Sequence, residues 1–205
     1  MSKRSRPDHF TLQARKMGYP ARSVFKLEEI QKKWLPMKKG FPVLDLGAAP
    51  GSWTLFALRS MGKGTQVVAV DIQPLEITAP TGSDLKYTQQ DVFSDEAEEF
   101  LAAHGPYGCV LSDAAPFTSG NHLVDSQKSF NLAMRVVDLA EAHLIQQGNL
   151  VVKILQGGDE GKLRKRLRSL FDNIKTFKPR ATRCESIETY MIGMRFSKKA
   201  SNNSL

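Results

Sequence analysis

The chain has 205 residues, of which 41% are hydrophobic and 24% charged, and its formal net charge is +8. These values predict one globular domain over residues 1–205, with a sizeable core. The sequence excludes a membrane-spanning helix, because it has no run of 18 apolar residues, and a disulfide scaffold, because it has two cysteines. The four histidines are scattered and match no metal-binding spacing, so we expect no metal site.

The charge is unevenly divided along the chain. Residues 1–39 carry a net charge of +8, residues 40–155 a net charge of −7, and residues 156–205 a net charge of +7. An acidic centre suits a cationic or hydroxyl-rich cofactor, and basic ends suit a polyanion, although a solvated basic surface is the alternative. The N-terminus lacks the apolar stretch of a secretory signal, and the two cysteines are far apart, which indicates a reducing cytoplasm.

The hydrophobic spacing predicts alternating strands and helices after a basic N-terminal segment. We expect residues 1–10 to be poorly ordered and the polar tail, 197–205, to be mobile. The long helix expected over residues 126–146 should end with Gly148 as its C-cap. The expected strands cover residues 41–46, 66–70, 85–89, 109–113, 150–155, 174–177 and 188–196, and the expected helices cover residues 12–34 (interrupted near Gly18), 52–61, 95–103, 126–146 and 161–171.

The stretch VLDLGAAPGSW, residues 43–53, is typical of a buried strand that turns sharply into a helix. Alternating strands and helices favour a parallel sheet with helices on both faces, and ligands then bind beyond the carboxyl ends of the strands. Asp71 ends the second strand about 20 residues after Gly51, where an acid commonly accepts hydrogen bonds from a ribose. Asp91 and Asp113 end later strands. A glycine-rich turn without a ligand is the alternative.

Four charged residues can meet at this edge of the sheet. Lys153 lies inside the apolar run VVKIL, where a lysine is costly unless it is paired or reaches solvent. Lys26 lies beside the apolar stripe of the first helix, Asp113 ends the fourth strand, and Glu188 begins the last one. Each of them alone could be an ordinary charge at the end of an element, but together they supply two cations and two carboxylates from four elements.

The motifs DLGAAPGSW (45–53), RSVFKL (22–27), SDAAP (112–116) and VVKILQG (151–157) resemble the FtsJ/RrmJ family of ribosomal-RNA 2′-O-ribose methyltransferases, over about residues 15–193. The resemblance implies an α/β, Rossmann-like, seven-stranded and mostly parallel sheet whose last strand is antiparallel. It implies S-adenosylmethionine as methyl donor. It also implies a catalytic tetrad of Lys26, Asp113, Lys153 and Glu188, and cofactor contacts from Gly51, Trp53, Asp71, Asp91 and Asp113.

Ser52 stands where the family frequently has a second glycine, and the Cys184-Glu185 pair differs from the usual basic run, which bears on the alignment of Glu188. The resemblance implies that Asp71 binds the cofactor ribose, Asp91 its adenine amino group, and that Asp113 lies near the sulfonium. Lys153 would either take the proton of the 2′-hydroxyl or stay charged and orient that hydroxyl.

The compact chain resembles most the bacterial form that acts on a uridine of 23S rRNA in the large ribosomal subunit, as a cytoplasmic monomer. The alternatives are a tRNA anticodon-loop 2′-O-methyltransferase and a non-catalytic RNA-binding or ribosome-assembly factor. A nicotinamide-dependent oxidoreductase is a third alternative, but the Gly-x-Gly-x-x-Gly pattern is missing because Ala49-Pro50 interrupts it.

Overall fold

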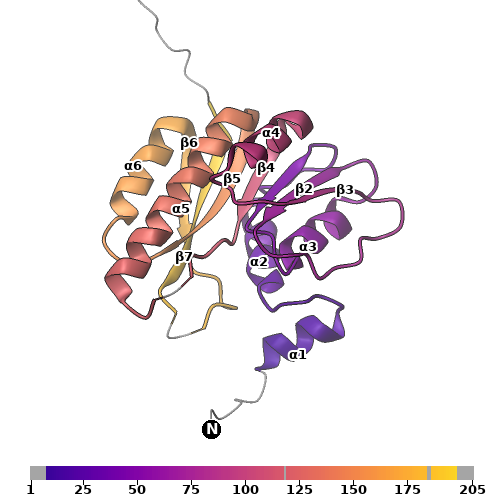
Figure 1. Ribbon diagram of the computed structural model, residues 1–205, viewed down its shortest axis with the longest axis horizontal. Coiled ribbons are helices and arrows are strands. Elements are labelled where there is room, and N and C mark those ends of the chain that lie inside the picture. Colours follow the sequence, from indigo (N-terminus) through magenta and orange to yellow (C-terminus); the bar gives the residue numbers. More distant parts are fainter. Residues whose placement is uncertain (1–7, 118, 184–185, 198–205) are drawn as a thin grey trace, which may run out of the picture.

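A computed structural model describes residues 8–117, 119–183 and 186–197 (Figure 1). Most of the segment predicted to be mobile at the C-terminus, and Cys184-Glu185, lie outside the described residues. The helices are α1 (His9–Lys16), α2 (Val24–Trp34), α3 (Ser52–Met61), α4 (Asp95–His104), α5 (His122–His143) and α6 (Glu160–Leu170). The strands are β1 (Val43–Leu46), β2 (Gln66–Asp71), β3 (Asp84–Gln89), β4 (Tyr107–Ser112), β5 (Leu144–Leu155), β6 (Phe171–Phe177) and β7 (Glu188–Phe196).

The strands form one seven-stranded sheet in the order β3-β2-β1-β4-β5-β7-β6. Strands β1 to β5 pair in parallel, whereas β7 is antiparallel to both of its neighbours. The predicted mostly parallel sheet with an antiparallel last strand is therefore confirmed. The strand order reverses between β1 and β4, and a sheet of this kind opens a crevice at such a point, beyond the carboxyl ends of the strands.

Helices α4, α5 and α6 cover one face of the sheet, and α2 and α3 cover the other (Figure 1). Side chains along a strand alternate between the two faces. Val43, Leu111 and Val151 belong to the core under α2 and α3. Asp45, Asp113 and Lys153 each come two positions later in the chain, so the same alternation directs these charged side chains toward the α2 and α3 side.

The boundary between α5 and β5 differs from the prediction. The helix begins four residues earlier, where the Asn121 side chain accepts hydrogen bonds from the backbone of Leu123 and Val124, and it ends at His143. Leu144 continues the helical spacing of apolar residues, yet it is buried as a strand residue opposite Tyr107. Gly148 therefore lies within β5, and the prediction that it caps the helix was wrong.

The N-terminal segment is also more ordered than expected. Helix α1 starts at His9, because the Asp8 carboxylate accepts a hydrogen bond from the backbone N–H of Thr11 at 2.9 Å, as an N-cap residue does. The predicted poor order of residues 1–10 is therefore wrong from Asp8 onward, and residues 1–7 lie outside the described chain.

Within the part that the structure describes, no helix combines the length and the hydropathy needed to cross a membrane.

Candidate active site

Two glycines shape the turn from β1 into α3. Gly47 has φ of 74°, and a Cβ atom there would lie 2.4 Å from the Cβ of Ala114. Gly51 has φ of 112°, and its Cβ would lie 2.6 Å from the Ile77 side chain. Both positions require glycine, because the backbone is left-handed and no space remains for a side chain. The loop after β1 therefore packs directly against the loop after β4.

A cavity of about 920 Å³ opens at this edge of the sheet, and we call it the main cavity. Its volume is typical of sites that hold a small molecule. Of the residues predicted to contact the cofactor, Asp71, Asp91 and Asp113 line it. The remaining lining residues are Gly47, Ala49, Pro50, Ile72, Gln73, Pro74, Glu76, Gln90, Val92, Phe93, Ala114, Ala115, Pro116, Phe117, Lys128, Asn131 and Leu132. Among residues 8–117, 119–183 and 186–197, no three His, Cys, Asp or Glu side chains gather as a metal would need.

The two acids at the β2 and β3 ends are held differently. The Asp71 carboxylate accepts hydrogen bonds from the backbone of Ala49 at 2.8 Å and of Gln73 at 2.7 Å, so it fastens the β1–α3 loop. Asp91 is exposed, and one of its oxygens accepts a hydrogen bond from the Phe93 backbone at 3.0 Å. Each carboxylate oxygen has two lone pairs, so both acids retain acceptor capacity toward a ligand in the main cavity.

Gly51 and Trp53 lie outside the lining of the main cavity, so their contact with the cofactor stays a prediction. Trp53 is 2% exposed, and its indole N–H donates to the Ser23 carbonyl at 2.9 Å. The neighbouring Ser52 hydroxyl accepts from the backbone N–H of Ala21 at 2.8 Å and donates to its carbonyl at 3.0 Å. The first turn of α3 thus fastens the segment that leads into α2, the helix that carries Lys26.

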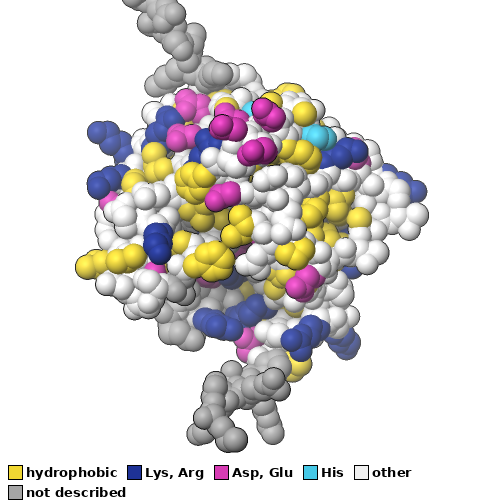
Figure 2. All heavy atoms as spheres, viewed as in Figure 1, with side chains coloured by type: hydrophobic (Ala, Val, Ile, Leu, Met, Phe, Trp, Pro, Cys, Tyr) yellow, Lys and Arg dark blue, Asp and Glu magenta, His cyan; other side chains and the backbone are white. Residues whose placement is uncertain are grey.

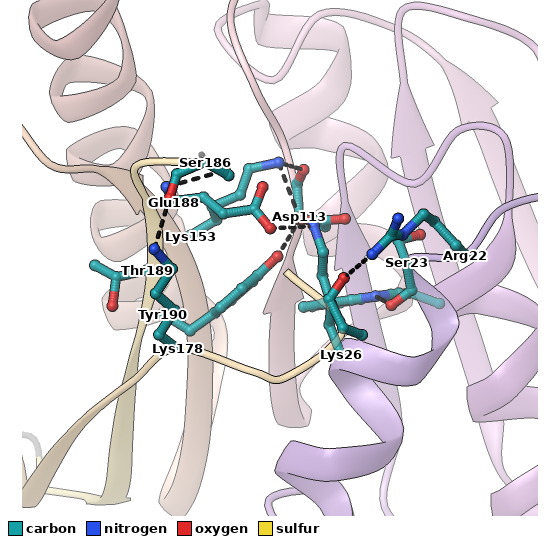
Figure 3. Close-up of polar contacts among 12 residues, drawn as sticks. Arg22, Ser23, Lys26, Asp113, Lys153, Lys178, Ser186, Glu188, Thr189 and Tyr190 are labelled. Atoms are coloured by element: carbon teal, nitrogen blue, oxygen red, sulfur yellow. Dashed lines mark hydrogen bonds and ion pairs between the residues drawn. The ribbon is translucent and has the colours of Figure 1, made fainter. Parts of the chain in front are cut away.

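The four residues of the predicted tetrad come together, and we call them the charged cluster (Figure 3). Lys153 Nζ lies 2.9 Å from Asp113 Oδ1 and also donates to the Asp113 carbonyl. Lys26 Nζ lies 2.5 Å from Glu188 Oε1 and 4.0 Å from Asp113 Oδ1. Both lysines are buried. Because Asp113 also lines the main cavity, the cluster and the cavity share one carboxylate.

Tyr190 is a fifth member of this arrangement, and the sequence analysis missed it. It lies opposite Lys153 in the β5–β7 ladder, two positions after Glu188, so the three side chains share one face of the sheet. The Tyr190 hydroxyl donates to Asp113 Oδ1 at 2.6 Å, and Lys26 Nζ lies 5.8 Å from the centre of its ring. Period-two spacing from Glu188 was the available signal, but it could not give the contact with Asp113.

The charges around Asp113 keep it ionised. Burial alone raises its pKa, but Lys153 and Lys26 outweigh that effect, and the hydrogen bond from Tyr190 adds to theirs, so the pKa of Asp113 is lowered overall. Burial raises the pKa of Tyr190 well above its usual range, so the hydroxyl keeps its proton and remains a donor. The cluster therefore presents an ionised carboxylate that bridges two buried lysines at the edge of the main cavity.

Asp45 is a buried acid next to this site and does not line the main cavity. It is fully buried, and its Oδ2 accepts a hydrogen bond from the Thr54 hydroxyl at 2.6 Å, whereas its Oδ1 has no partner among the described residues. Burial is the main reason that its pKa rises to about 7, from 3.8 for an unperturbed group, with smaller contributions from Asp113 and Asp71.

Replacing Asp45 by asparagine is expected to change how stability depends on pH. The native state of the wild type binds this proton more tightly than the unfolded state does, so its stability falls as pH rises from about 4 to about 7. Asparagine does not titrate, so the variant does not lose this stability as the pH rises. Between pH 5 and pH 8 the free energy of unfolding of Asp45→Asn should therefore rise, relative to wild type, by about 2–3 kcal/mol. Urea unfolding at both pH values measures the difference, and parallel wild-type and variant curves would contradict the assignment.

Comparison with known proteins identifies the family of this chain. The FtsJ-like methyltransferase family model matches residues 19–196. The chain is 44% identical to the ribosomal RNA large subunit methyltransferase E of Oleidesulfovibrio alaskensis, over 92% of this chain and 91% of that protein. It is 45% identical to the protein of the same name from Sorangium cellulosum, over 93% and 88%. Its fold resembles a crystal structure assigned as a Plasmodium falciparum ribosomal RNA methyltransferase, with a TM-score of 0.75 and 24% identity over 88% and 100% of the two chains. With a family model that spans most of its length and relatives this similar, the chain belongs to the FtsJ-like methyltransferase family.

Proposed function

We propose that this protein transfers a methyl group from S-adenosylmethionine to the 2′-hydroxyl of a uridine in 23S rRNA of the large ribosomal subunit. The observation that carries the proposal is the charged cluster, in which Asp113 bridges Lys26 and Lys153 at the edge of the main cavity. The names of the relatives support ribosomal RNA of the large subunit as substrate. The choice of a uridine rests on the family resemblance.

The main cavity suits the methyl donor. S-adenosylmethionine supplies a methyl group carried on a positively charged sulfur. The cavity is lined by four carboxylates and one lysine, and this negative charge favours a cationic ligand. In this proposal Asp71 accepts hydrogen bonds from the ribose hydroxyls, Asp91 accepts one from the adenine amino group, and Asp113 lies beside the sulfonium.

The charged cluster suits the acceptor. A 2′-hydroxyl is a poor nucleophile until its proton begins to leave, and methyl transfer requires the oxygen to be aligned with the methyl carbon. Two N–H groups of Lys153 Nζ donate to the carboxylate and the carbonyl of Asp113, which leaves one position on the nitrogen for the 2′-hydroxyl. That position is a lone pair if the amine takes the hydroxyl proton, and a third N–H donor if Lys153 only orients the hydroxyl. When bound, S-adenosylmethionine would supply the methyl group to the 2′-oxygen. In this proposal the hydroxyl proton would pass to the lone pair of Lys153, and Lys26 would stabilise the developing charge on the oxygen.

Basic side chains suit the RNA backbone. The solvent side of α6 and the N-terminal helices carry Lys and Arg side chains, whereas acidic side chains lie near α4 (Figure 2). Phosphate contacts of this kind hold RNA without reading its sequence. The arrangement agrees with a substrate whose backbone spans basic surfaces on either side of the acidic cavity.

Mapping of ribose methyl groups tests the function. Large ribosomal subunits from cells that lack the gene are incubated with the purified protein and tritiated S-adenosylmethionine, and the labelled nucleotide is located. We expect label on the 2′-oxygen of one uridine of 23S rRNA. Label in tRNA instead would support the anticodon-loop alternative, and binding of the methyl donor without transfer to any RNA would support a non-catalytic factor.

A further inference from the structure

An aromatic side chain stands in solvent on the rim of the main cavity. Phe117 is 73% exposed and lies four positions after Asp113. Four residues of chain span at most about 14 Å, which is the upper limit for the distance between the Cα atoms of Phe117 and Asp113. Phe93 and Ile72, which also line the main cavity, are 55% and 47% exposed. A single exposed apolar residue needs no explanation, but several of them beside a cavity are typical of a surface that binds something.

Hydrogen bonds to α5 hold two residues that follow Phe117 in the chain. The Asp125 carboxylate accepts hydrogen bonds from the backbone of Ser119 at 2.7 Å, from the Ser119 hydroxyl at 2.8 Å and from the backbone of Gly120 at 3.2 Å. These hydrogen bonds lower the pKa of Asp125, so the carboxylate stays ionised and the loop stays fastened near neutral pH. Ser119 and Gly120, two and three positions after Phe117, are thus fixed to the first turn of α5.

The same turn is fixed to the strand that carries Lys153. The Ser126 hydroxyl donates to the Gln156 carbonyl at 3.2 Å, just beyond the end of β5. Gly157 packs so closely on Ser126 that a Cβ atom at residue 157 would lie 2.3 Å from it. The turn of α5 that holds Ser119 and Gly120 is therefore also fixed to the strand that carries Lys153. This suits a neighbouring group that must be aligned with the reacting atoms.

An unpaired nucleobase is the ligand that this geometry suits. The base is attached to the same ribose as the reacting hydroxyl, so a nucleotide placed against Lys153 brings its base to the rim of the cavity. Recognition of single RNA bases relies on stacking against aromatic side chains. The other exposed aromatic ring of the cavity, Phe93, follows Asp91 and β3, which lies three strand positions away from β4, so it belongs to the opposite end.

We propose that Phe117 is the platform on which the base of the target nucleotide stacks while its 2′-hydroxyl is held against Lys153. This inference rests on the proposed function. It makes Phe117 a positioning residue for the RNA and not for the methyl donor. Because every base has an aromatic face, the contact fixes the orientation of the nucleotide and does not select its identity.

The test compares Phe117→Ala, Phe117→Leu and Phe117→Trp with the wild type, using undermethylated large ribosomal subunits and tritiated S-adenosylmethionine. Loss of one base–aromatic stack should lower kcat/KM for the subunits about 5- to 100-fold in the alanine and leucine variants. The tryptophan variant should stay within about twofold of wild type, because a larger ring stacks at least as well. Calorimetric affinity for S-adenosylmethionine should be unchanged in all three. Leu123→Ala, an equally exposed aliphatic site, is the matched control and should behave as wild type.

Several outcomes would overturn the inference. Wild-type kcat/KM in Phe117→Leu would mean that any apolar side chain suffices, as in a contact with a ribosomal protein. A parallel loss of affinity for S-adenosylmethionine in Phe117→Ala would assign the ring to the donor. A wild-type protein that methylates no RNA is a different result, because it overturns the proposed function itself, and in that case fluorescence anisotropy with a labelled single-stranded oligouridine still tests stacking. There, tighter binding by wild type and Phe117→Trp than by Phe117→Leu supports the platform, and equal affinities overturn it.

Discussion

Replacing Lys153 by alanine is expected to abolish methyl transfer while the affinity for S-adenosylmethionine survives. Lys153 is a member of the charged cluster and contacts Asp113, but it does not line the main cavity. In the proposed mechanism, its removal takes away the group that faces the acceptor oxygen, whereas the residues that line the donor cavity are kept. Loss of a positioned general base lowers kcat by about 10²- to 10⁴-fold. Tritium transfer to large ribosomal subunits measures the rate, and calorimetry measures the donor affinity.

Two further variants sharpen this result. Lys63→Ala removes an exposed lysine just beyond α3 and should leave the rate unchanged. Lys153→Arg keeps the positive charge but cannot give up a proton near neutral pH. An inactive arginine variant supports proton removal by Lys153, whereas substantial activity would mean that the residue only orients the hydroxyl. Near-full activity of Lys153→Ala would exclude both roles.

Replacing Asp113 by asparagine is expected to damage both stability and activity. The substitution removes the negative charge that two buried lysines share, and breaking a buried ion pair from one side costs about 3–5 kcal/mol. Activity should fall by at least about 10²-fold, because the lysines lose the partner that orients them. Urea unfolding at pH 7 and single-turnover methylation measure the two effects.

The stability that Asp113 contributes depends on pH. The pKa of Asp113 is lower in the native state than in the unfolded chain, so its contribution is complete above the unfolded value of 3.8 and is lost as pH falls through the native one. The stability difference between wild type and Asp113→Asn should therefore be full at pH 7 and shrink below about pH 4. Asp84→Asn, which breaks an exposed pair with Lys86, is the control and should cost little at either pH. A difference that is equally large at pH 3 would argue against the charge as its cause.

Local patterns were enough to predict most of the fold. Short apolar runs, the alternation of strands with helices and the glycine-rich turn after β1 predicted the parallel strands and the crevice, because these signals depend on neighbours close in sequence. The helix predicted over residues 52–61 and the strand predicted over residues 188–196 match α3 and β7. The end of α5 could not be predicted, because Leu144 satisfies helical spacing and its strand state depends on pairing with Tyr107.

The members of the charged cluster could be predicted from the sequence, but the further contacts that hold them together could not. A lysine within an apolar strand stands out in the sequence, whereas the hydrogen bond from Tyr190 to Asp113 joins residues 77 positions apart and depends on the β5–β7 register. The hydrogen bond of Trp53 could not be predicted from the sequence either. Its motif suggests a cofactor contact, yet its indole N–H bonds to Ser23, a partner that appears only once α2 packs on α3.

The place of β7 in the sheet determines how much of the chain must be synthesised before the charged cluster can form. This strand is the last to be synthesised, yet it inserts between β5 and β6. Arg22 donates to the carbonyl of Ala181, 159 positions later, and Glu29 accepts from the backbone of Arg180, 151 positions later. Until translation has passed Phe196, Lys153 faces an open sheet edge and Lys26 lacks Glu188. The charged cluster therefore forms only after β7 has inserted into the sheet, whereas every residue that lines the main cavity lies between positions 47 and 132 and comes earlier in the chain.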